Sequence, residues 1–181
     1  TSVTIKFKLT HQFDWNTCIA FHGTLLFLAA CSTSSSVILY DMSSILLPQP
    51  TIKYLIRDHI NRVNTVAFHP TQPLFATGSN DHTAILYDFA VSPPTIKYHF
   101  KHHSDVVTRV IFHHSLPFFV TGSFDSTVIM YDISKVQPTI KHHFKYNIGR
   151  ISDVIFHPIV FMFGTCFVFG PIILHNINQL K

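Results

Sequence analysis

The feature that most constrains the fold is a unit of about 44 residues that recurs along the chain. The tetrapeptide Pro-Thr-Ile-Lys begins at Pro50, Pro94 and Pro138, and the related Val-Thr-Ile-Lys begins 47 residues before the first of these, at Val3. Self-similarity at a period of roughly 20–50 residues indicates a repeat architecture, in which each unit buries its apolar face against its neighbours. We therefore expect a row of similar units in place of one irregular core.

Two further markers keep the same register as this tetrapeptide. An apolar residue followed by Tyr-Asp ends three units, and a Phe-His pair follows a short apolar run in all four. The apolar-Tyr-Asp endings lie at residues 39–41, 86–88 and 130–132, with Leu-His-Asn at 174–176. These markers predict one domain over residues 1–181, or part of such a domain. Its four repeats cover approximately residues 3–47, 50–91, 94–135 and 138–178.

Each repeat has the pattern of four short β-strands. In the third repeat, residues 95–101 (TIKYHFK) place Ile96, Tyr98 and Phe100 on one face and polar residues on the other. Alternation with a period of two is typical of a strand that is covered on one side only. Three more apolar runs follow, at residues 106–112, 118–123 and 127–132. No helical periodicity of useful length occurs, so we expect an all-β fold of four-stranded antiparallel units.

The second and third repeats carry the most specific motifs. Residues 77–88 (TGSNDHTAILYD) and 121–132 (TGSFDSTVIMYD) resemble the Ser/Thr-Gly-Ser-x-Asp…Trp-Asp ending of the WD-repeat family, with Tyr in place of Trp. Upstream of them, His59 and His103 take the position of the His in the family's Gly-His opening. The resemblance implies a β-propeller with about four WD-type blades, either as an arc of a larger ring or as a small closed ring.

The resemblance also implies a hydrogen-bonded network within each blade, which joins a His, a Ser or Thr, an Asp and the aromatic residue. Such a network is chemically reasonable, because a buried Asp needs donors and a His ring can link it to a hydroxyl. The matching residues are His59, Thr77, Ser79, Asp81 and Tyr87, then His103, Thr121, Ser123, Asp125 and Tyr131. The outer repeats depart from this pattern at Gln12, Ser34, Asn147, Phe169 and His175. Neither outer repeat is expected to form the full network.

The fourteen histidines raise the question of a metal site. Most of them recur at fixed repeat positions, such as the column His22, His69, His113 and His157. Copies about 44 residues apart belong to different blades, so their spacing predicts no compact tetrahedral ligand set. The sequence also lacks GxSxG, HExxH and glycine-rich phosphate-binding motifs. We therefore expect a protein without catalytic residues, metal or cofactor.

Basic residues gather on the first strand of each repeat, which would be the outermost strand of a blade. Eight of the thirteen Lys and Arg residues lie there: Lys6, Lys8, Lys53, Arg57, Lys97, Lys101, Lys141 and Lys145. Lys on an exposed outer strand discourages aggregation between sheet edges, and this is the favoured interpretation. The alternative is an anionic partner such as RNA, which a net charge of +4 does not by itself support.

The resemblance further implies that partners dock on a narrow face formed by loops at one edge of the blades. Aromatic and Arg side chains on that face would suit an interface, because they dominate interface energetics. The residues expected there are Asn61, Arg62, Asn80, His82, Ser104, Asp105, Phe124 and Arg150. The favoured function is a non-catalytic protein-interaction scaffold within a macromolecular complex. The alternative is a nucleic-acid-associated propeller of the RNA-processing type, which would use the basic rim.

Cysteine usage and hydropathy bear on the compartment. The three cysteines are far apart and include no CxxC pair, which favours a reducing, intracellular compartment, either the cytoplasm or the nucleus. Residues 159–174 carry no charge, but the stretch is shorter than the ~18 residues of a spanning helix. Gly164, Gly170 and Pro171 also divide it into pieces of strand length. We therefore expect no membrane segment.

The ends of the chain leave two arrangements open. In a closed four-bladed ring, residues 4–9 would pair with residues 172–177 and complete the last blade. In a fragment of a larger propeller, each end would expose an apolar sheet face larger than the few hundred Å² that monomers tolerate. The fourth repeat is unusually apolar, with Phe161, Phe163 and Phe167. We therefore favour the fragment, with its open ends covered by missing blades or by another chain.

Overall fold

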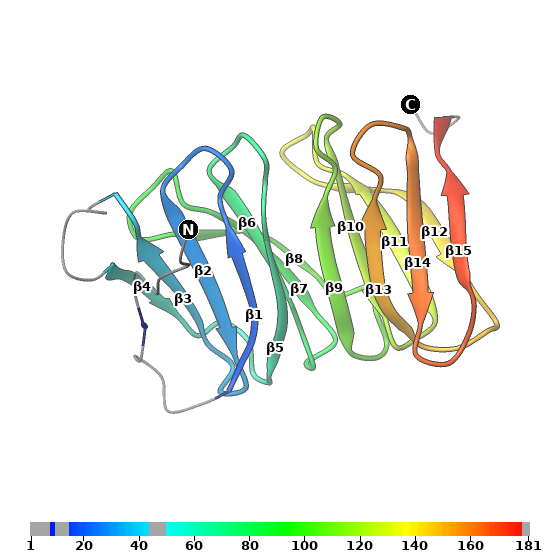
Figure 1. Cartoon of the computed structure of the whole chain (residues 1–181), viewed down its shortest axis with the longest axis horizontal. Coiled ribbons are helices and arrows are strands. Elements are labelled where there is room, and N and C mark those ends of the chain that lie inside the picture. Colours follow the sequence, from blue (N-terminus) through cyan, green and yellow to red (C-terminus); the bar gives the residue numbers. More distant parts are fainter. Residues whose placement is uncertain (1–7, 10–14, 44–49, 179–181) are drawn as a thin grey trace, which may run out of the picture.

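The computed structural model describes residues 8–9, 15–43 and 50–178. Among these residues it contains fifteen β-strands in four antiparallel sheets and no α-helix (Figure 1). We call the sheets blades 1 to 4 in chain order. The all-β fold of antiparallel blades that the repeats predict is confirmed.

Each blade follows the chain from an inner strand to an outer strand. Blade 1 consists of β1 (Asn16–Phe21), β2 (Phe27–Ser32), β3 (Val37–Asp41) and β4 (Thr51–Ile56). Blade 2 consists of β5 (Val63–Phe68), β6 (Leu74–Ser79), β7 (Ala84–Asp88) and β8 (Thr95–Phe100). Blade 3 consists of β9 (Val107–Phe112), β10 (Phe118–Ser123), β11 (Thr127–Asp132) and β12 (Thr139–Lys145). In the described part of the chain, blade 4 has only β13 (Ile151–Phe156), β14 (Met162–Phe167) and β15 (Ile172–Asn176).

In blades 1 to 3, the outer strand comes from the repeat that follows in the sequence. The Thr-Ile-Lys segment that opens the second repeat forms β4, and β4 pairs with β3 of the first repeat. The same relation joins β8 to β7 and β12 to β11. Each blade is therefore offset from its sequence repeat by one strand, and the shared strand ties consecutive repeats together.

Neighbouring blades cover one another, so the middle strands are buried on both faces. β6 and β10 are buried along their whole length, whereas the outer strands β4, β8 and β12 are largely exposed. The inner strands β1, β5, β9 and β13 pack against one another in that order. A strand covered on both sides tends to be a continuous apolar run, and Phe118–Ser123 begins with one.

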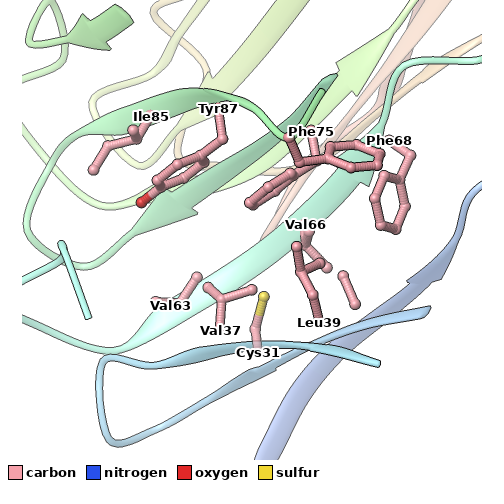
Figure 2. Close-up of a cluster of buried hydrophobic side chains, with 11 residues drawn as sticks. Cys31, Val37, Leu39, Val63, Val66, Phe68, Phe75, Ile85 and Tyr87 are labelled. Atoms are coloured by element: carbon pink, nitrogen blue, oxygen red, sulfur yellow. The ribbon is translucent and has the colours of Figure 1, made fainter. Parts of the chain in front are cut away.

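Each blade boundary is filled by an apolar cluster. Between blades 1 and 2, Cys31 and Val37 lie near Val63 of the next inner strand, and Leu39 lies near Val66 (Figure 2). Phe75 and Tyr87 stack in the same cluster, with ring centroids 4.5 Å apart. Burying a side chain of this size stabilises the fold by about 1.5–3 kcal/mol, so these boundaries hold the row of blades together.

The glycines of the two Thr-Gly-Ser motifs are required by close packing at these boundaries. A Cβ atom at Gly78 would lie 2.7 Å from Val107 Cγ1 of blade 3, and one at Gly122 would lie 2.7 Å from Val154 Cγ2 of blade 4. Such contacts are far inside van der Waals distance. The glycine therefore forms a hollow that receives a β-branched side chain of the next blade.

The outer strands do not keep the simple alternation expected for residues 95–101. Tyr98 and Phe100 pack toward blade 3 as predicted, but Ile96 is largely exposed. The register between β7 and β8 shifts between Leu86 and Tyr87, which indicates a β-bulge. A bulge places two residues of one strand opposite one residue of the other and so breaks the alternation of faces. The prediction was therefore wrong for Ile96.

The four blades form an open arc. Blade 1 and blade 4 lie at opposite ends of the molecule (Figure 1), so the alternative of a closed four-bladed ring is wrong. Residues 4–7 of the predicted closing strand lie outside the described residues. Leu9, which ends that segment, packs against the apolar cluster of Leu28, Ala30, Ile38 and Tyr40 in blade 1.

The uncharged stretch 159–174 contributes β14 and part of β15. No helix in the described residues is long and apolar enough to cross a membrane.

Candidate functional site

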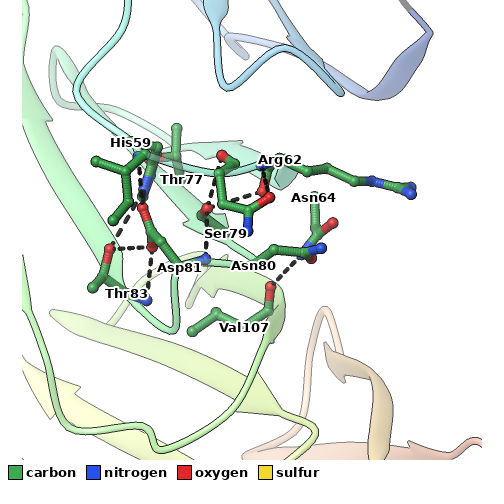
Figure 3. A network of polar contacts seen from close by, with 11 residues as sticks. His59, Arg62, Asn64, Thr77, Ser79, Asn80, Asp81, Thr83 and Val107 are labelled. Atoms are coloured by element: carbon green, nitrogen blue, oxygen red, sulfur yellow. Dashed lines mark hydrogen bonds and ion pairs between the residues drawn. The ribbon is translucent and has the colours of Figure 1, made fainter.

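A buried polar network in blade 2 joins the loop before the inner strand to the turn between the second and third strands (Figure 3). His59 Nδ1 lies 2.7 Å from Asp81 Oδ2, and His59 Nε2 lies 2.8 Å from Thr77 Oγ1. Thr83 donates its hydroxyl to Asp81 Oδ1 at 2.6 Å, and the Ile60 amide donates to Oδ2 at 3.2 Å. An ionised carboxylate only accepts hydrogen bonds, so His59 Nδ1 donates to it.

The environment of Asp81 favours its ionised form. Burial disfavours the charge, but hydrogen bonds from His59 and Thr83 outweigh this and hold the pKa of the carboxyl well below its usual range. Ser79 extends the network, because its hydroxyl lies within hydrogen-bonding distance of the Asn61 and Arg62 carbonyls at 3.1 and 2.9 Å. The network thereby holds two surface segments in one geometry.

Blade 3 contains the same arrangement. His103 Nδ1 lies 2.8 Å from Asp125 Oδ2, and His103 Nε2 lies 2.7 Å from Thr121 Oγ1. Ser123 donates to the Asp105 carbonyl at 3.1 Å. Burial again opposes ionisation of Asp125, and the hydrogen bond from His103 contributes most to lowering its pKa well below the usual range.

The two tyrosines expected in the networks differ in their hydrogen bonds. Tyr131 in blade 3 shares a hydrogen bond of 3.2 Å with His102 Nδ1. The Tyr87 hydroxyl is buried in blade 2 and makes no hydrogen bond with any described residue. Burial raises the pKa of both phenols, so both stay protonated. Tyr87 thus acts mainly through its stack on Phe75.

The end blades have other polar groups at these positions. In blade 1, the Ser32 hydroxyl lies 2.8 Å from Ser34 Oγ and 2.9 Å from Ser36 Oγ, which gives a small hydroxyl cluster. Gln12, the expected His position, lies outside the described residues.

In blade 4, His175 Nε2 lies 2.8 Å from the Tyr146 hydroxyl and 3.0 Å from Thr165 Oγ1. Tyr146 was not singled out from the sequence, because it lies outside the family motif. Phe169 and Asn147 are exposed.

The loops near these networks form one edge of the arc. We call it the loop edge: residues 57–62, 101–106 and 145–150, with the turns at 80–83, 124–126 and 168–171. Backbone hydrogen bonds of 2.9 Å join loop to turn in blades 2, 3 and 4, as from the Asn80 amide to the Arg62 carbonyl. The eight residues expected on the narrow face all lie on this edge.

Five of those eight residues are exposed: Asn61, Arg62, His82, Ser104 and Arg150. The other three are half-buried and have partners within the chain. Asn80 Oδ1 accepts from the side-chain amide of Asn64 at 2.7 Å, and Asp105 Oδ1 accepts from the backbone amide of Val106 at 2.7 Å. The Arg150 guanidinium lies over the Phe124 ring, 5.2 Å from its centroid, and joins blades 3 and 4 by a cation–π contact.

The histidine column has a structural role that the sequence did not reveal. His22, His69, His113 and His157 each accept, at Nδ1, the backbone amides two and three residues later, at distances of 2.9–3.2 Å. Each ring thus caps the turn between the inner and second strands. Burial lowers the pKa of His69 and His113, with help from a neighbouring His ring in each case. Among the described residues, no group of three or more His, Cys, Asp or Glu is placed to hold a metal ion.

The basic residues on the outer strands are exposed, and some are paired. Lys53 Nζ lies 3.5 Å from Asp41, and Lys97 Nζ lies 3.7 Å from Asp88. Each pair joins the outer strand to the Asp that ends the third strand. Lys6 lies outside the described residues.

The comparisons with known proteins agree with this geometry. The WD40 family model, described as WD domain, G-beta repeat, matches residues 50–88 and 94–132. These are the second and third repeats, which supply both His–Thr–Asp networks. No curated protein matches the chain.

Proposed function

Because the WD40 family model matches the second and third repeats, we propose that the chain acts as a non-catalytic scaffold that holds other proteins together within a macromolecular complex. WD40 repeats generally mediate protein–protein interaction, and the family is typically non-catalytic. We propose that the loop edge is the docking surface and that Arg62, His82 and Arg150 contact the partner.

The observation that carries this proposal is the rigid support beneath the loop edge. In blades 2 and 3, the buried networks fix the loop and the turn, while Arg62, His82 and Ser104 remain exposed. A surface that is ordered before binding loses less conformational entropy when a partner docks. Arg is also among the residues enriched in binding hot spots.

Quantitative affinity purification tests the proposal. The variant Arg62→Glu/His82→Glu/Arg150→Glu should lose its specific partners, because three exposed contacts become acidic. Lys135→Glu is the matched control, since Lys135 is exposed on a connection away from the loop edge. Equal recovery of every partner by the triple variant and the control would refute docking at this edge.

A second candidate is binding of RNA or another polyanion. The exposed row Lys53, Arg57, Lys97, Lys101, Lys141 and Lys145 along three outer strands favours it. The ion pairs of Lys53 and Lys97 weaken it, because these charges are already partly neutralised. A salt titration separates the two functions: RNA affinity that falls linearly and steeply in log–log form supports the second.

We also propose that the protein works in a reducing intracellular compartment, the cytoplasm or the nucleus. Cys18, Cys31 and Cys166 are free thiols, which suits such a compartment. We propose as well that further blades or another chain cover the open ends of the arc.

A further inference from the structure

Blade 4 carries an apolar face that the other blades bury. Ile155, Ile172 and Leu174 are 65%, 72% and 67% exposed. They form one strip across the sheet, because Ile155 and Leu174 both pair with Gly164 of the middle strand. In blade 3, the positions of Ile172 and Leu174 are Val128 and Met130, and both are completely buried under blade 4.

Within the chain, the inner strand of the next blade covers this face. Its β-branched side chains enter a hollow at a small residue of the middle strand. Val107 and Val110 lie over Gly78, and Ile151 and Val154 lie over Gly122. In blade 4 the small residue is Cys166, next to the exposed Ile172 in the sheet.

A polar contact recurs at the same boundaries. Each of the first three inner strands has a polar side chain that donates to a backbone carbonyl of the next inner strand. The pairs are Thr17 to Val63, Asn64 to Val107, and Thr108 to Ile151. The matching residue of blade 4 is Ser152, whose hydroxyl donates only to Cys166 of its own blade among the described residues.

The inner strand of blade 1 is the exposed part of the matching face, whereas Leu28, Ile38 and Tyr40 on the same face are buried within the chain. This inner strand places Asn16 and Ile19 at the positions of Val63 and Val66, and Ile19 is 63% exposed. Phe21 and Trp15, close to Ile19 in the sequence, are also largely exposed. An exposed apolar inner strand and an exposed apolar sheet face, which meet at every blade boundary within the chain, therefore lie at opposite ends of the arc (Figure 1).

The strand order supplies an independent argument. In blades 1 to 3, the Thr-Ile-Lys strand of the following repeat pairs with the third strand. The corresponding edge of β15 is unpaired among the described residues. Leu9 packs against an apolar cluster of blade 1, and Ile56, its counterpart one repeat later, packs against the cluster between blades 1 and 2.

We propose that the open face of blade 4 binds blade 1 of a second copy of this chain. Two four-bladed arcs then close head to tail into one ring of eight blades, within the observed range of about four to eight. The contact is heterologous, and the two-fold rotation of the ring closes it. This proposal rests on the proposed function in one respect, that something covers the open ends of the arc. It identifies that cover as a second copy of the chain.

Light scattering coupled to size-exclusion chromatography tests the proposal. The wild-type chain should have twice its monomer mass of 20.7 kDa at micromolar concentration. Ile172→Lys and Ile19→Lys should each give monomers, because each breaks both junctions of the ring. Val136→Lys is the matched control on an exposed loop and should remain dimeric. A wild-type monomer at all concentrations, or a dimer that survives both substitutions, would overturn the proposal.

Mixing the two monomeric variants tests the head-to-tail geometry. One junction in the mixture carries neither substitution, so an equimolar mixture should recover a dimer. If the dimer formed through identical patches, each variant would remain unable to dimerise in the mixture. A mixture that stays monomeric would therefore contradict the head-to-tail ring. Circular dichroism on each variant should match the wild type, because both residues are exposed.

Disulfide trapping tests directly which residue of the second copy Ile19 contacts. Ile19→Cys should form a disulfide with Cys166 of the second copy under oxidised glutathione, giving a dimer on a non-reducing gel. The added change Cys166→Ser should abolish that dimer. Trapping that is unaffected by Cys166→Ser would place Ile19 elsewhere. The loop-edge variants of the scaffold test should remain dimeric, so loss of partner binding and loss of the ring can be told apart.

Discussion

Blades 2 and 3 contain a buried His–Thr–Asp network, whereas blades 1 and 4 contain a serine cluster and a Tyr–His pair in its place. The first three strands of all four blades nevertheless keep the same order and the same antiparallel pairing. The apolar clusters at the three boundaries are common to all of them. Boundary packing therefore determines the blade, and the network determines the geometry of the loop edge above it.

The largest effect is expected from breaking a boundary. Gly122→Val should destabilise the protein by about 3 kcal/mol, because its side chain would overlap Val154 and Ile151 of blade 4. Urea denaturation measures the loss. Gly164→Ala is the matched control on the open face of blade 4, where a Cβ meets only ordinary contacts of 3.4 Å or more. Similar losses at both glycines would show that boundary packing does not distinguish the blades.

The second-largest effect is expected from breaking a buried network, compared with the equivalent change in an end blade. His59→Ala or Asp81→Ala should cost about 1–3 kcal/mol, since the buried partner loses its hydrogen bond. Phe169→Ala changes the position in blade 4 that corresponds to Asp81, and this exposed side chain should contribute less than about 0.5 kcal/mol. Thermal denaturation of the three variants provides the measurement. A large loss at Phe169 would contradict the distinction between network and end blades.

Acid should weaken the turns capped by histidine before it weakens the networks. The pKa of His69 and of His113 is lowered in the folded protein, so the unfolded chain binds more protons. Stability from these rings is present above the unfolded pKa of about 6.5 and falls as pH drops below it, by at most about 1.4 kcal/mol per pH unit for each ring. Asp81 and Asp125 also have lowered pKa values, and their contribution is lost only as pH falls below about 4.

Melting temperatures between pH 7.5 and pH 3 check this order. His69→Gln should flatten the decline between pH 6.5 and pH 5, whereas His82→Gln, an exposed control, should leave it unchanged. A decline confined to pH below 4 would argue against the turn-capping role.

The smallest effect concerns the cation–π contact between blades 3 and 4. Arg150→Gln should reduce stability by about 0.5 kcal/mol, because the guanidinium leaves the face of Phe124. Arg62→Gln has no such ring contact among the described residues and serves as the control. Differential scanning calorimetry resolves the difference, and equal effects of the two substitutions would mean that the contact adds nothing measurable.

Much of the architecture could be read from the sequence, because its determinants are local and periodic. The repeat predicted four units, the alternation and apolar runs predicted strands, and the spacing of His59, Thr77 and Asp81 is the same as that of His103, Thr121 and Asp125. The structure brings each of these triplets together. A side-chain period of two and a recurrent motif are properties that the chain carries without reference to its neighbours.

The tertiary structure decided what depends on how neighbouring strands and blades meet. The bulge that exposes Ile96, the hydrogen bond that Tyr131 makes and Tyr87 lacks, and the Arg150–Phe124 contact all require exact register or distance. In the sequence, the capping histidines could be recognised only as a residue type that recurs at one repeat position. Their acceptor role depends on the path of the turn that brings the backbone amides to Nδ1. The open arc was likewise decided by the tertiary structure. Closure of a ring depends on the rotations accumulated between blades, and no local motif encodes these rotations.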